Sequence, residues 1–405
     1  MKMKMVEKGV CAPIGFKANG LHCGIRRNKA KRDLALIVSD VPCTAAAVYT
    51  TNLVKGAPLT VTKTNLMDGK AQAIICNSGN ANTCNADGVM IAEGMCKLVA
   101  DKLGIAPKDV VVASTGVIGQ PLSLEPIASG MDALAEGLGD NGALAAEAIM
   151  TTDTISKEVA VEFELGDRIC RIGGIAKGSG MIHPNMATML VFITTDVAIT
   201  SELLHECLQE DVKSTFNMVS VDGDTSTNDM AVVLANGKAN NKTISNKNSD
   251  YKVFAKALRK VTTELCRKIA SDGEGASKLL TCSVINANNA DSARKVAKTV
   301  ITSNLLKAAM FGSDANWGRV LCAIGYSGAD LDLNTIDVAF SSVSGRIEVC
   351  KNGAGLDFDE EIAKEILLEK EIVIYINLNN GSYGADAWGC DLTYDYVRIN
   401  GDYRT

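Results

Sequence analysis

Residues 177–193 read Lys-Gly-Ser-Gly-Met-Ile-His-Pro-Asn-Met-Ala-Thr-Met-Leu-Val-Phe-Ile. This stretch begins as a glycine-spaced loop that carries Lys177, and after Ala187 and Thr188 it becomes an apolar, β-favouring run that predicts a buried strand. A small hydroxyl residue at the mouth of a buried strand, beside a loop with exposed backbone amides and a cation, suits a nucleophile. The same pattern also fits a turn followed by a core strand, so the stretch alone leaves both interpretations open.

The overall composition is that of an ordinary globular protein. The chain of 405 residues is long enough for two or three domains, and its apolar and charged fractions of 47% and 22% are typical of such domains. A net charge of −6 without long runs of one sign, together with 4% aromatic residues, argues against nucleic acid or an anionic membrane as a partner. The N-terminal lysines precede no apolar segment, and no window is apolar enough to span a bilayer. We therefore expect no secretory signal and no membrane.

The cysteines and histidines do not form a recognisable metal or disulfide pattern. Thirteen cysteines are scattered from Cys11 to Cys390 without a CxxC pair, although disulfide frameworks and zinc knuckles need tighter spacing. The three histidines, His22, His183 and His205, are too far apart to suggest a metal site. We expect no metal, and reduced, mostly buried cysteines in a cytoplasmic protein.

Short apolar runs alternate with amphipathic patterns along the chain. Residues 159–165 and 168–175 predict a hairpin with Gly166-Asp167 at its turn. Glycine-containing loops are expected at 77–82 and 113–121, each directly after a strand. The absence of a βαβ nucleotide fingerprint favours α+β layers. Further strands are expected at 34–38, 45–49, 73–76, 110–112, 279–286, 372–376 and 394–399, and helices at about 251–269, 290–310 and 359–367.

Several common catalytic and binding motifs are missing from the sequence. It contains no GxSxG nucleophile elbow and no GxxxxGK[ST] phosphate loop, which removes the commonest hydrolase and nucleotide-binding interpretations. Residues 222–229, Asp-Gly-Asp-Thr-Ser-Thr-Asn-Asp, superficially resemble a calcium loop. Thr227 occupies the position that needs glycine and Val233 the position that needs glutamate, so we expect a polar turn there.

Threonine chemistry remains. A threonine hydroxyl is a poor nucleophile without a neighbouring base, and an N-terminal threonine supplies that base through its own α-amine, whose pKa is about 8. Thr188 would acquire such an amine only if the bond after Ala187 were cut. Attack of its Oγ1 on the Ala187 carbonyl, followed by ester hydrolysis, would cut that bond, and the donors that stabilise the oxyanion would then serve later acyl transfer.

Residues 177–190 resemble the self-cleavage motif of the ornithine acetyltransferase family, also called the glutamate N-acetyltransferase or ArgJ family. The resemblance runs nearly end to end, and its separate matches occur in one order. They include Gly15–Gly20, Cys76–Asn82, Ser114–Gly119, Thr151–Thr154, Asp272–Ala276, Gly312–Arg319 and Asp395–Thr405.

The resemblance implies a fold and a division of the chain. It implies an α+β fold, a layered αββα sandwich of the ArgJ/DmpA type with a smaller C-terminal α/β domain. Self-cleavage would give an α chain of residues 1–187 and a β chain of residues 188–405, with 188–282 completing the sandwich and 283–405 forming the smaller domain. Two copies of each chain are expected in an α2β2 heterotetramer.

The resemblance also implies a reaction. Acetyl would pass from N²-acetyl-L-ornithine to L-glutamate through an acetyl ester on Thr188, in cyclic arginine biosynthesis and without a cofactor. Use of acetyl-CoA as a further donor stays open. Thr188 would be the nucleophile, Thr115 and Gly116 the oxyanion hole, and His183 has no implied role. The implied substrate-binding residues are Thr154, Lys177, Thr188, Glu274, Asn400 and Thr405.

The charges of two of these residues fit amino-acid substrates independently, since a carboxylate needs a cation and an ammonium needs an anion. We therefore expect Lys177 to bind the carboxylate and Glu274 the amine. Two alternatives share much of the pattern. One is an N-terminal-nucleophile amidase or aminopeptidase, which would give the acyl group to water. The other is a non-catalytic metabolite-binding protein in which Thr188 is structural.

Overall fold

The computed structural model describes residues 3–183 and 189–402, and these residues form two compact units. The first unit contains residues 3–178, 189–213 and 225–265, and the second contains residues 179–183, 214–224 and 266–402. The stretch from Lys177 to Ile193 therefore contributes to both units. Within the described ranges, no helix is both long and apolar enough to cross a membrane.

The first unit is built on strands that form one continuous hydrogen-bonded ladder. The ladder runs in the order β1-β6-β7-β8-β10-β3-β4-β5, and β2 pairs with β3 beside β4. Its strands are β1 (Lys4–Val6), β2 (Phe16–Leu21), β3 (Leu34–Tyr49), β4 (Lys70–Asn80), β5 (Val110–Val117), β6 (Lys157–Leu165), β7 (Arg168–Lys177), β8 (Leu190–Thr195) and β10 (Met230–Ala235).

Strand β3 joins two layers of this ladder. Its residues 34–38 pair with β2 and β4, its residues 44–49 pair with β10, and the register shifts between Val38 and Cys43. A register shift of this kind bends a strand and increases its twist. One layer therefore contains β1, β6, β7, β8, β10 and the end of β3, and the other contains β2, β4, β5 and the start of β3.

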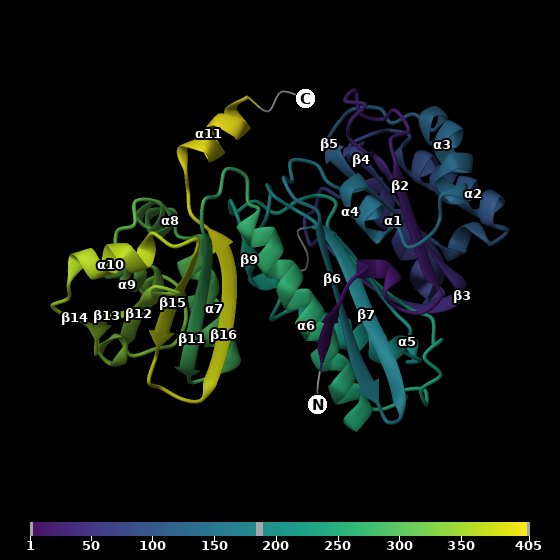
Figure 1. Ribbon diagram of the computed structural model, residues 1–405. Helices are drawn as coiled ribbons and strands as arrows, with labels where there is room; N and C mark the ends of the chain where they lie inside the picture. The colour runs from purple at the N-terminus through teal and green to yellow at the C-terminus, as the bar shows by residue number, and fades with distance from the viewer. Residues whose placement is uncertain (1–2, 184–188, 403–405) are drawn as a thin grey trace. The chain divides into compact units, whose positions relative to one another are not determined.

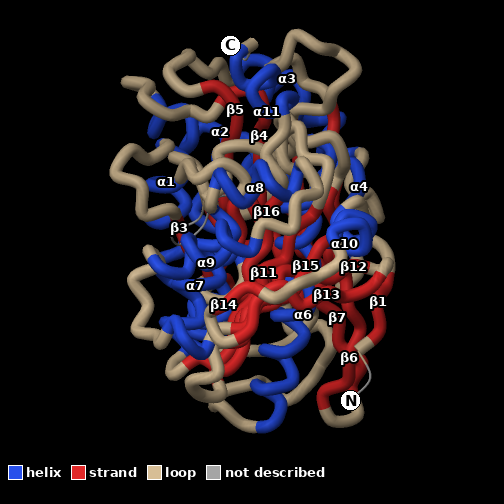
Figure 2. Tube along the Cα trace, turned by 90° about the vertical axis from the view of Figure 1, so that its left-hand side faces the viewer, coloured by secondary structure: helices blue, strands red, loops and turns tan. Residues whose placement is uncertain are grey.

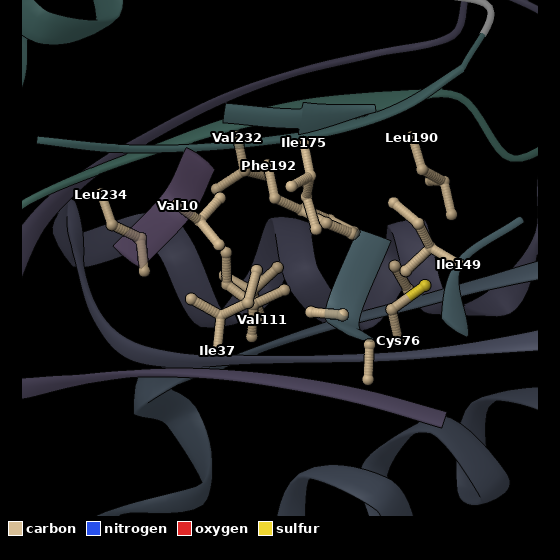
Figure 3. Packing of buried hydrophobic residues seen from close by; sticks show 14 of the residues in the cluster. Val10, Ile37, Cys76, Val111, Ile149, Ile175, Leu190, Phe192, Val232 and Leu234 are labelled. Carbon is tan, nitrogen blue, oxygen red and sulfur yellow. The ribbon is translucent and has the colours of Figure 1, made fainter. Parts of the chain in front are cut away.

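The two layers enclose the main apolar core. Because side chains alternate between the faces of a strand, every second residue points into the space between the layers. Figure 3 shows Val232, Ile175 and Phe192 of one layer directed toward Ile37 and Val111 of the other. All five of these side chains are at most 1% exposed. Burial of this facing set is the main apolar contribution to holding the layers together.

Helices cover the outer face of each layer (Figure 1). A second apolar cluster, which includes Ile75, Met95 and Val112, lies between β3–β5 and the helices α1 (Ala57–Asn65), α2 (Gly88–Leu103) and α3 (Glu125–Glu136). On the other side, α5 (Ser201–Val212) packs on β3, and Leu265 of α6 (Ser249–Ser271) lies against Gly174 of β7. A shorter helix, α4 (Gly142–Ala148), adds alanines to the main core. The first unit is thus an αββα sandwich, as expected.

The second unit is a two-layer α/β structure. Figure 2 shows β11, β15, β12 and β13 side by side, and the full strand order is β14-β13-β12-β15-β11-β16-β9. Helix α7 packs on β11 and β16, and α10 packs on β12 and β13. The strands are β9 (Val219–Ser220), β11 (Leu279–Ala287), β12 (Asp337–Ser342), β13 (Gly345–Lys351), β14 (Ala354–Gly355), β15 (Glu371–Asn377) and β16 (Tyr383–Cys390); the helices are α7 (Ala290–Thr302), α8 (Asn304–Phe311), α9 (Trp317–Gly325), α10 (Glu360–Leu367) and α11 (Tyr394–Gly401).

Most expected elements are present, but the predictions for 394–399 and 290–310 were wrong, and the strands expected at 34–38 and 45–49 are one strand, β3. The hairpin of β6 and β7 is confirmed, with Gly166 in the left-handed region at its turn. Residues 394–399 form helix α11 rather than a strand, because Thr393 caps it by accepting a hydrogen bond from the Tyr396 N–H. The single helix expected at 290–310 is two helices, since Ser303 leaves the helical conformation and caps α8.

Candidate active site

Strand β8 lies between β7 and β10, and its first residue is held on both sides. Leu190 pairs with Lys177 of β7 and with Met230 of β10. The N–H of Met230 donates to the carbonyl of Met189 at 2.9 Å. Thr188 itself lies outside the described residues, but the residue that follows it in the chain is thus bonded to the start of β10.

Lys177 ends β7 and places its ammonium group inside the sandwich. Its Nζ lies 3.4 Å from Oγ1 of Thr115, near the end of β5. The two residues are only 8% and 7% exposed. Because β7 and β5 belong to different layers, this contact brings together two predicted site residues that are 62 positions apart in the chain.

A buried carboxylate lies beside this cation. Asp153 accepts hydrogen bonds from Nζ of Lys157 at 2.6 Å and from the N–H of Gly178 at 2.7 Å. Burial opposes ionisation of this group, but the charges of Lys177 and Lys157 outweigh burial and lower the pKa of Asp153 to about 2. Asp153 is therefore ionised at neutral pH and anchors the loop that follows Lys177. Thr154, a predicted substrate-binding residue, comes next in the chain and is exposed.

Gly116 occupies a position that only glycine fits. Its φ is +135°, and a Cβ added there would lie 2.3 Å from the carbonyl carbon of Gly79 and 2.5 Å from the backbone nitrogen of Asn80. Gly116 is paired with Gly79 at the end of the β4–β5 ladder. Thr115 and Gly116 therefore belong to the strand end, not to the loop that we expected at 113–121. The close approach of β4 fixes the backbone that carries the two predicted oxyanion donors.

Sequence patterns missed one buried acid in this region. Asp229 is 3% exposed, and no described residue forms a hydrogen bond with its Oδ2. Burial raises the pKa of Asp229 well above its ordinary value, although a hydrogen bond with Ser226 and the charge of Lys177 act in the opposite direction. We had assigned Asp229 to a polar turn. Asp229 directly precedes the apolar run of β10, as Thr188 precedes the apolar run of β8. This position in the sequence could have predicted that Asp229 is buried near the site.

The second unit brings together two further predicted residues. Glu274 donates its N–H to the Ser179 carbonyl at 2.9 Å, and a Cβ added to Gly180 would lie 2.4 Å from the Glu274 carboxylate. Nδ2 of Asn400 donates to Oε2 of Glu274 at 2.8 Å. The glycine-spaced loop thus allows the carboxylate to lie against its backbone. The remaining predicted residues, Ala187, Thr188 and Thr405, lie outside the described ranges.

The polar turn expected at 222–229 is an irregular segment whose last three residues, 227–229, are buried. Its first residue, Asp222, holds the loop before the predicted cleavage site. The carboxylate of Asp222 accepts hydrogen bonds from the N–H groups of Met181 and Ile182 at 2.7 and 2.8 Å. Met181 has a φ of +55°, a left-handed conformation that is unfavourable for this side chain. The two hydrogen bonds stabilise that conformation.

His183, the last described residue before the gap, is held neutral. Its Nδ1 lies 3.1 Å from Oγ of Ser220. Burial, with a smaller contribution from the charge of Lys298, lowers the pKa of His183 to about 4. A neutral imidazole at physiological pH fits a structural contact as well as it fits proton transfer.

Fold and site together define a class of αββα proteins. In this class a buried cation, Lys177, lies at the end of the strand that pairs with β8, and it contacts a strand end whose backbone requires glycine at Gly116. The chain belongs to the ArgJ family, whose family model matches residues 17–405.

Named relatives and a solved structure agree with this assignment. Arginine biosynthesis bifunctional protein ArgJ 1 of Clostridium acetobutylicum is 52% identical over 392 residues, 96% of each chain. Arginine biosynthesis bifunctional protein ArgJ of Caldanaerobacter subterraneus subsp. tengcongensis is 49% identical over 405 residues, the full length of both chains. A crystal structure of the protein named arginine biosynthesis bifunctional protein argJ from Bacillus halodurans has 46% identity and a TM-score of 0.50, and covers 52% of this chain and 98% of its own.

The crowding at Gly116 predicts the effect of adding one methyl group. Gly116→Ala should displace the end of β5 from β4 and reduce acetyl transfer to glutamate by at least ~100-fold, the usual consequence of losing an oxyanion donor. The matched control is Gly119→Ala, which also has a positive φ of +77° but meets nothing within 4 Å. Initial rates and thermal unfolding of both variants test this. Equally reduced rates in the two variants would show that backbone strain at a positive φ, not displacement of β5, causes the loss of activity.

The buried ion pair of Asp153 predicts a stability loss that depends on pH. Asp153→Asn leaves Lys157 buried without its anion and should lower the free energy of unfolding by about 3–5 kcal/mol at pH 7. Because the folded pKa of about 2 is below the ordinary 3.8, the stabilisation is complete above about pH 4 and is lost as the pH falls toward 2. Denaturant unfolding at several pH values measures the difference. Asp101→Asn, which removes an exposed i,i+4 partner of Lys97, should cost less than about 1 kcal/mol.

Proposed function

We propose that this protein is a self-processing acetyltransferase of arginine biosynthesis, which transfers acetyl from N²-acetyl-L-ornithine to L-glutamate through an ester on Thr188. The observation that carries the proposal is the contact between Lys177 and Thr115. It joins the strand paired with Leu190, two residues after Thr188, to the strand end that carries the proposed oxyanion donors. Membership of the ArgJ family and the names of its relatives support the same reaction.

Self-cleavage comes first in the proposed mechanism. Oγ1 of Thr188 attacks the Ala187 carbonyl, the peptide nitrogen leaves as the amine of Thr188, and an ester joins the two residues. Water then hydrolyses this ester and releases the Ala187 carboxylate. Backbone and side-chain donors at Thr115 and Gly116 stabilise the oxyanion in both steps. The crystal-structure chain of the Bacillus halodurans relative matches only about half of this chain, which agrees with a relative whose polypeptide is divided into two chains.

Acetyl transfer then uses the new N-terminus of the β chain. The free amine of Thr188 takes the proton from its own Oγ1 as the hydroxyl attacks the acetyl carbonyl, and it returns the proton to ornithine as ornithine leaves. Glutamate enters, its amine attacks the acetyl ester, and acetylglutamate leaves with the threonine restored. Two half-reactions through one acyl-enzyme give ping-pong kinetics.

Charge determines the proposed roles in substrate binding. Lys177 binds the substrate α-carboxylate, and its burial in an αββα sandwich strengthens that interaction relative to water. Glu274 binds the side-chain ammonium of ornithine, and Asn400 orients the Glu274 carboxylate through the hydrogen bond at 2.8 Å. Thr154 and Thr405 provide further polar contacts to the substrate.

The proposal includes an assembly and a location. Residues 1–187 form the α chain and residues 188–405 the β chain, with residues 188–282 completing the sandwich and residues 283–405 forming a smaller domain, and two of each chain form the heterotetramer. No cysteine among the described residues forms a disulfide, which suits work in the reducing cytoplasm.

Electrophoresis tests self-cleavage directly. The wild-type protein should give two bands of about 20 and 23 kDa, scaled by length from 42.7 kDa, because the bond before Thr188 is broken. Thr188→Ala lacks the nucleophile and should stay as one intact chain, and N-terminal sequencing of the β chain should begin at Thr188. A variant that still splits at this bond would disprove the mechanism.

Transfer of labelled acetyl distinguishes the proposed enzyme from the hydrolase alternative. With labelled acetylornithine and glutamate, the label should appear in acetylglutamate, and the β chain should carry one acetyl group by mass spectrometry when glutamate is omitted. Release of labelled acetate that glutamate does not divert would favour an amidase or aminopeptidase. A parallel reaction with labelled acetyl-CoA decides whether it also serves as a donor.

A further inference from the structure

Asn228, two residues before β10, uses every hydrogen-bonding site of its side-chain amide. Its Nδ2 donates to the carbonyl of Ala81 at 2.6 Å and to the carbonyl of Ser114 at 2.9 Å. Its Oδ1 lies 2.6 Å from the hydroxyl oxygens of both Thr83 and Thr227. The residue is 6% exposed. Two donors and two acceptor sites are thus satisfied inside the first unit.

The two carbonyls that Asn228 holds belong to the predicted oxyanion region. Ser114 directly precedes Thr115 on β5. Ala81 follows Asn80, whose backbone lies against Gly116. The amide of Asn228 therefore donates hydrogen bonds at the ends of both β4 and β5. The close approach of these two strand ends fixes the backbone at Thr115 and Gly116.

The chain just after Asn228 is bonded to the strand that follows Thr188. Two positions after Asn228, the N–H of Met230 donates to the carbonyl of Met189 at 2.9 Å. Met230 also pairs with Leu190 in the β10–β8 ladder. One side chain thus connects the layer that contains β8 to the layer that contains β5, at the end of the sandwich where the predicted oxyanion donors occur.

A second asparagine, just beyond the other end of β10, shows what a purely structural bridge looks like. Asn236, at the far end of β10, donates through Nδ2 to the carbonyl of Ile14 at 2.9 Å and to Oγ of Ser39 at 3.3 Å. It therefore joins segments that are distant in sequence, as Asn228 does. None of its contacts involves the strand ends at Ala81, Ser114 or Gly116.

We propose that Asn228 is a positioning residue for acyl transfer: it holds the oxyanion donors of Thr115 and Gly116 at the correct distance from the acyl carbon on Thr188. This inference rests on the proposed function. Oxyanion donors act only within about 2.7–3.1 Å of the developing charge, and a displacement of about 1 Å can reduce a rate about 100-fold. A side chain that sets this distance affects the chemical steps more than it affects substrate binding.

Asn228→Asp tests the proposal with almost no change in shape. The carboxylate keeps the acceptor atoms for Thr83 and Thr227 but replaces the donor to Ala81 and Ser114 by an oxygen that repels both carbonyls. The expected results are a fall of about 100-fold in kcat with KM for acetylornithine within about threefold, and a similar slowing of self-cleavage. Initial rates of acetylglutamate formation measure kcat and KM, and mass spectrometry measures acetylation of the β chain. The cleaved fraction on gels over time measures self-cleavage.

Asn236→Asp is the matched control, because it makes the same chemical change beside the opposite end of β10. It should retain kcat within about twofold while losing a comparable amount of thermal stability. If the two variants change stability and kcat alike, Asn228 is only a structural bridge and the proposal is wrong. An active wild type with an equally active Asn228→Asp variant overturns this inference alone, whereas a wild type that transfers no acetyl overturns the proposed function.

A milder variant covers the case in which Asn228→Asp does not fold. Thr83→Val removes one hydroxyl beside Oδ1 at nearly constant volume and leaves the amide donors in place. The proposal requires a reduction of kcat that is smaller than the one in Asn228→Asp but in the same direction, with KM unchanged. Wild-type kcat in a folded Thr83→Val variant, together with an Asn228→Asp variant that does not fold, would contradict a positioning role.

Discussion

The ionised carboxylate of Asp153 is the interaction on which the first unit's polar interior depends. It lies beside two buried lysines, accepts hydrogen bonds from Lys157 and from the backbone after Lys177, and has a lowered pKa because those charges outweigh its burial. Removing an isolated charge from water costs several kcal/mol, and this anion offsets part of that cost for both lysines. The position of Lys177 at the end of β7, and with it the contact to Thr115, follows from this compensation.

Buried groups of both signs surround Lys177. Burial raises the pKa of Asp229 and so disfavours a second carboxylate there, whereas the charges of Lys177 and Lys157 keep Asp153 ionised. The buried ammonium group of Lys177 can therefore attract a further anion. A substrate carboxylate or a developing oxyanion would be such an anion, and the low local dielectric makes that attraction stronger than at a surface. An anionic ligand is thus favoured by this charge as well as by the family assignment.

Local patterns predicted the elements of the fold well but could not predict the contacts that form the site. The β6–β7 hairpin followed from alternation and a glycine turn. Hydropathy ended the β5 strand at Val112, because Ser114 and Thr115 are polar, yet they continue the strand by pairing with the equally polar end of β4. The tether from Asn228 to Ser114 spans 114 positions, and no local propensity encodes it. Thr115 and Gly116 were named only through resemblance to a known family.

The buried charge of Lys177 also bears on the proposed base. The α-amine of an N-terminal threonine has an ordinary pKa of about 8, so in water at neutral pH it would be mostly protonated and unable to accept a proton. A buried cation nearby disfavours a second positive charge and lowers the pKa of such an amine. Lys177 pairs with Leu190, two residues after Thr188 in the chain, and its charge helps to lower the pKa of Asp153. On the proposed mechanism, a Thr188 amine that acts within reach of Lys177 would be favoured in its basic form, which would join substrate binding and nucleophile activation in one electrostatic arrangement.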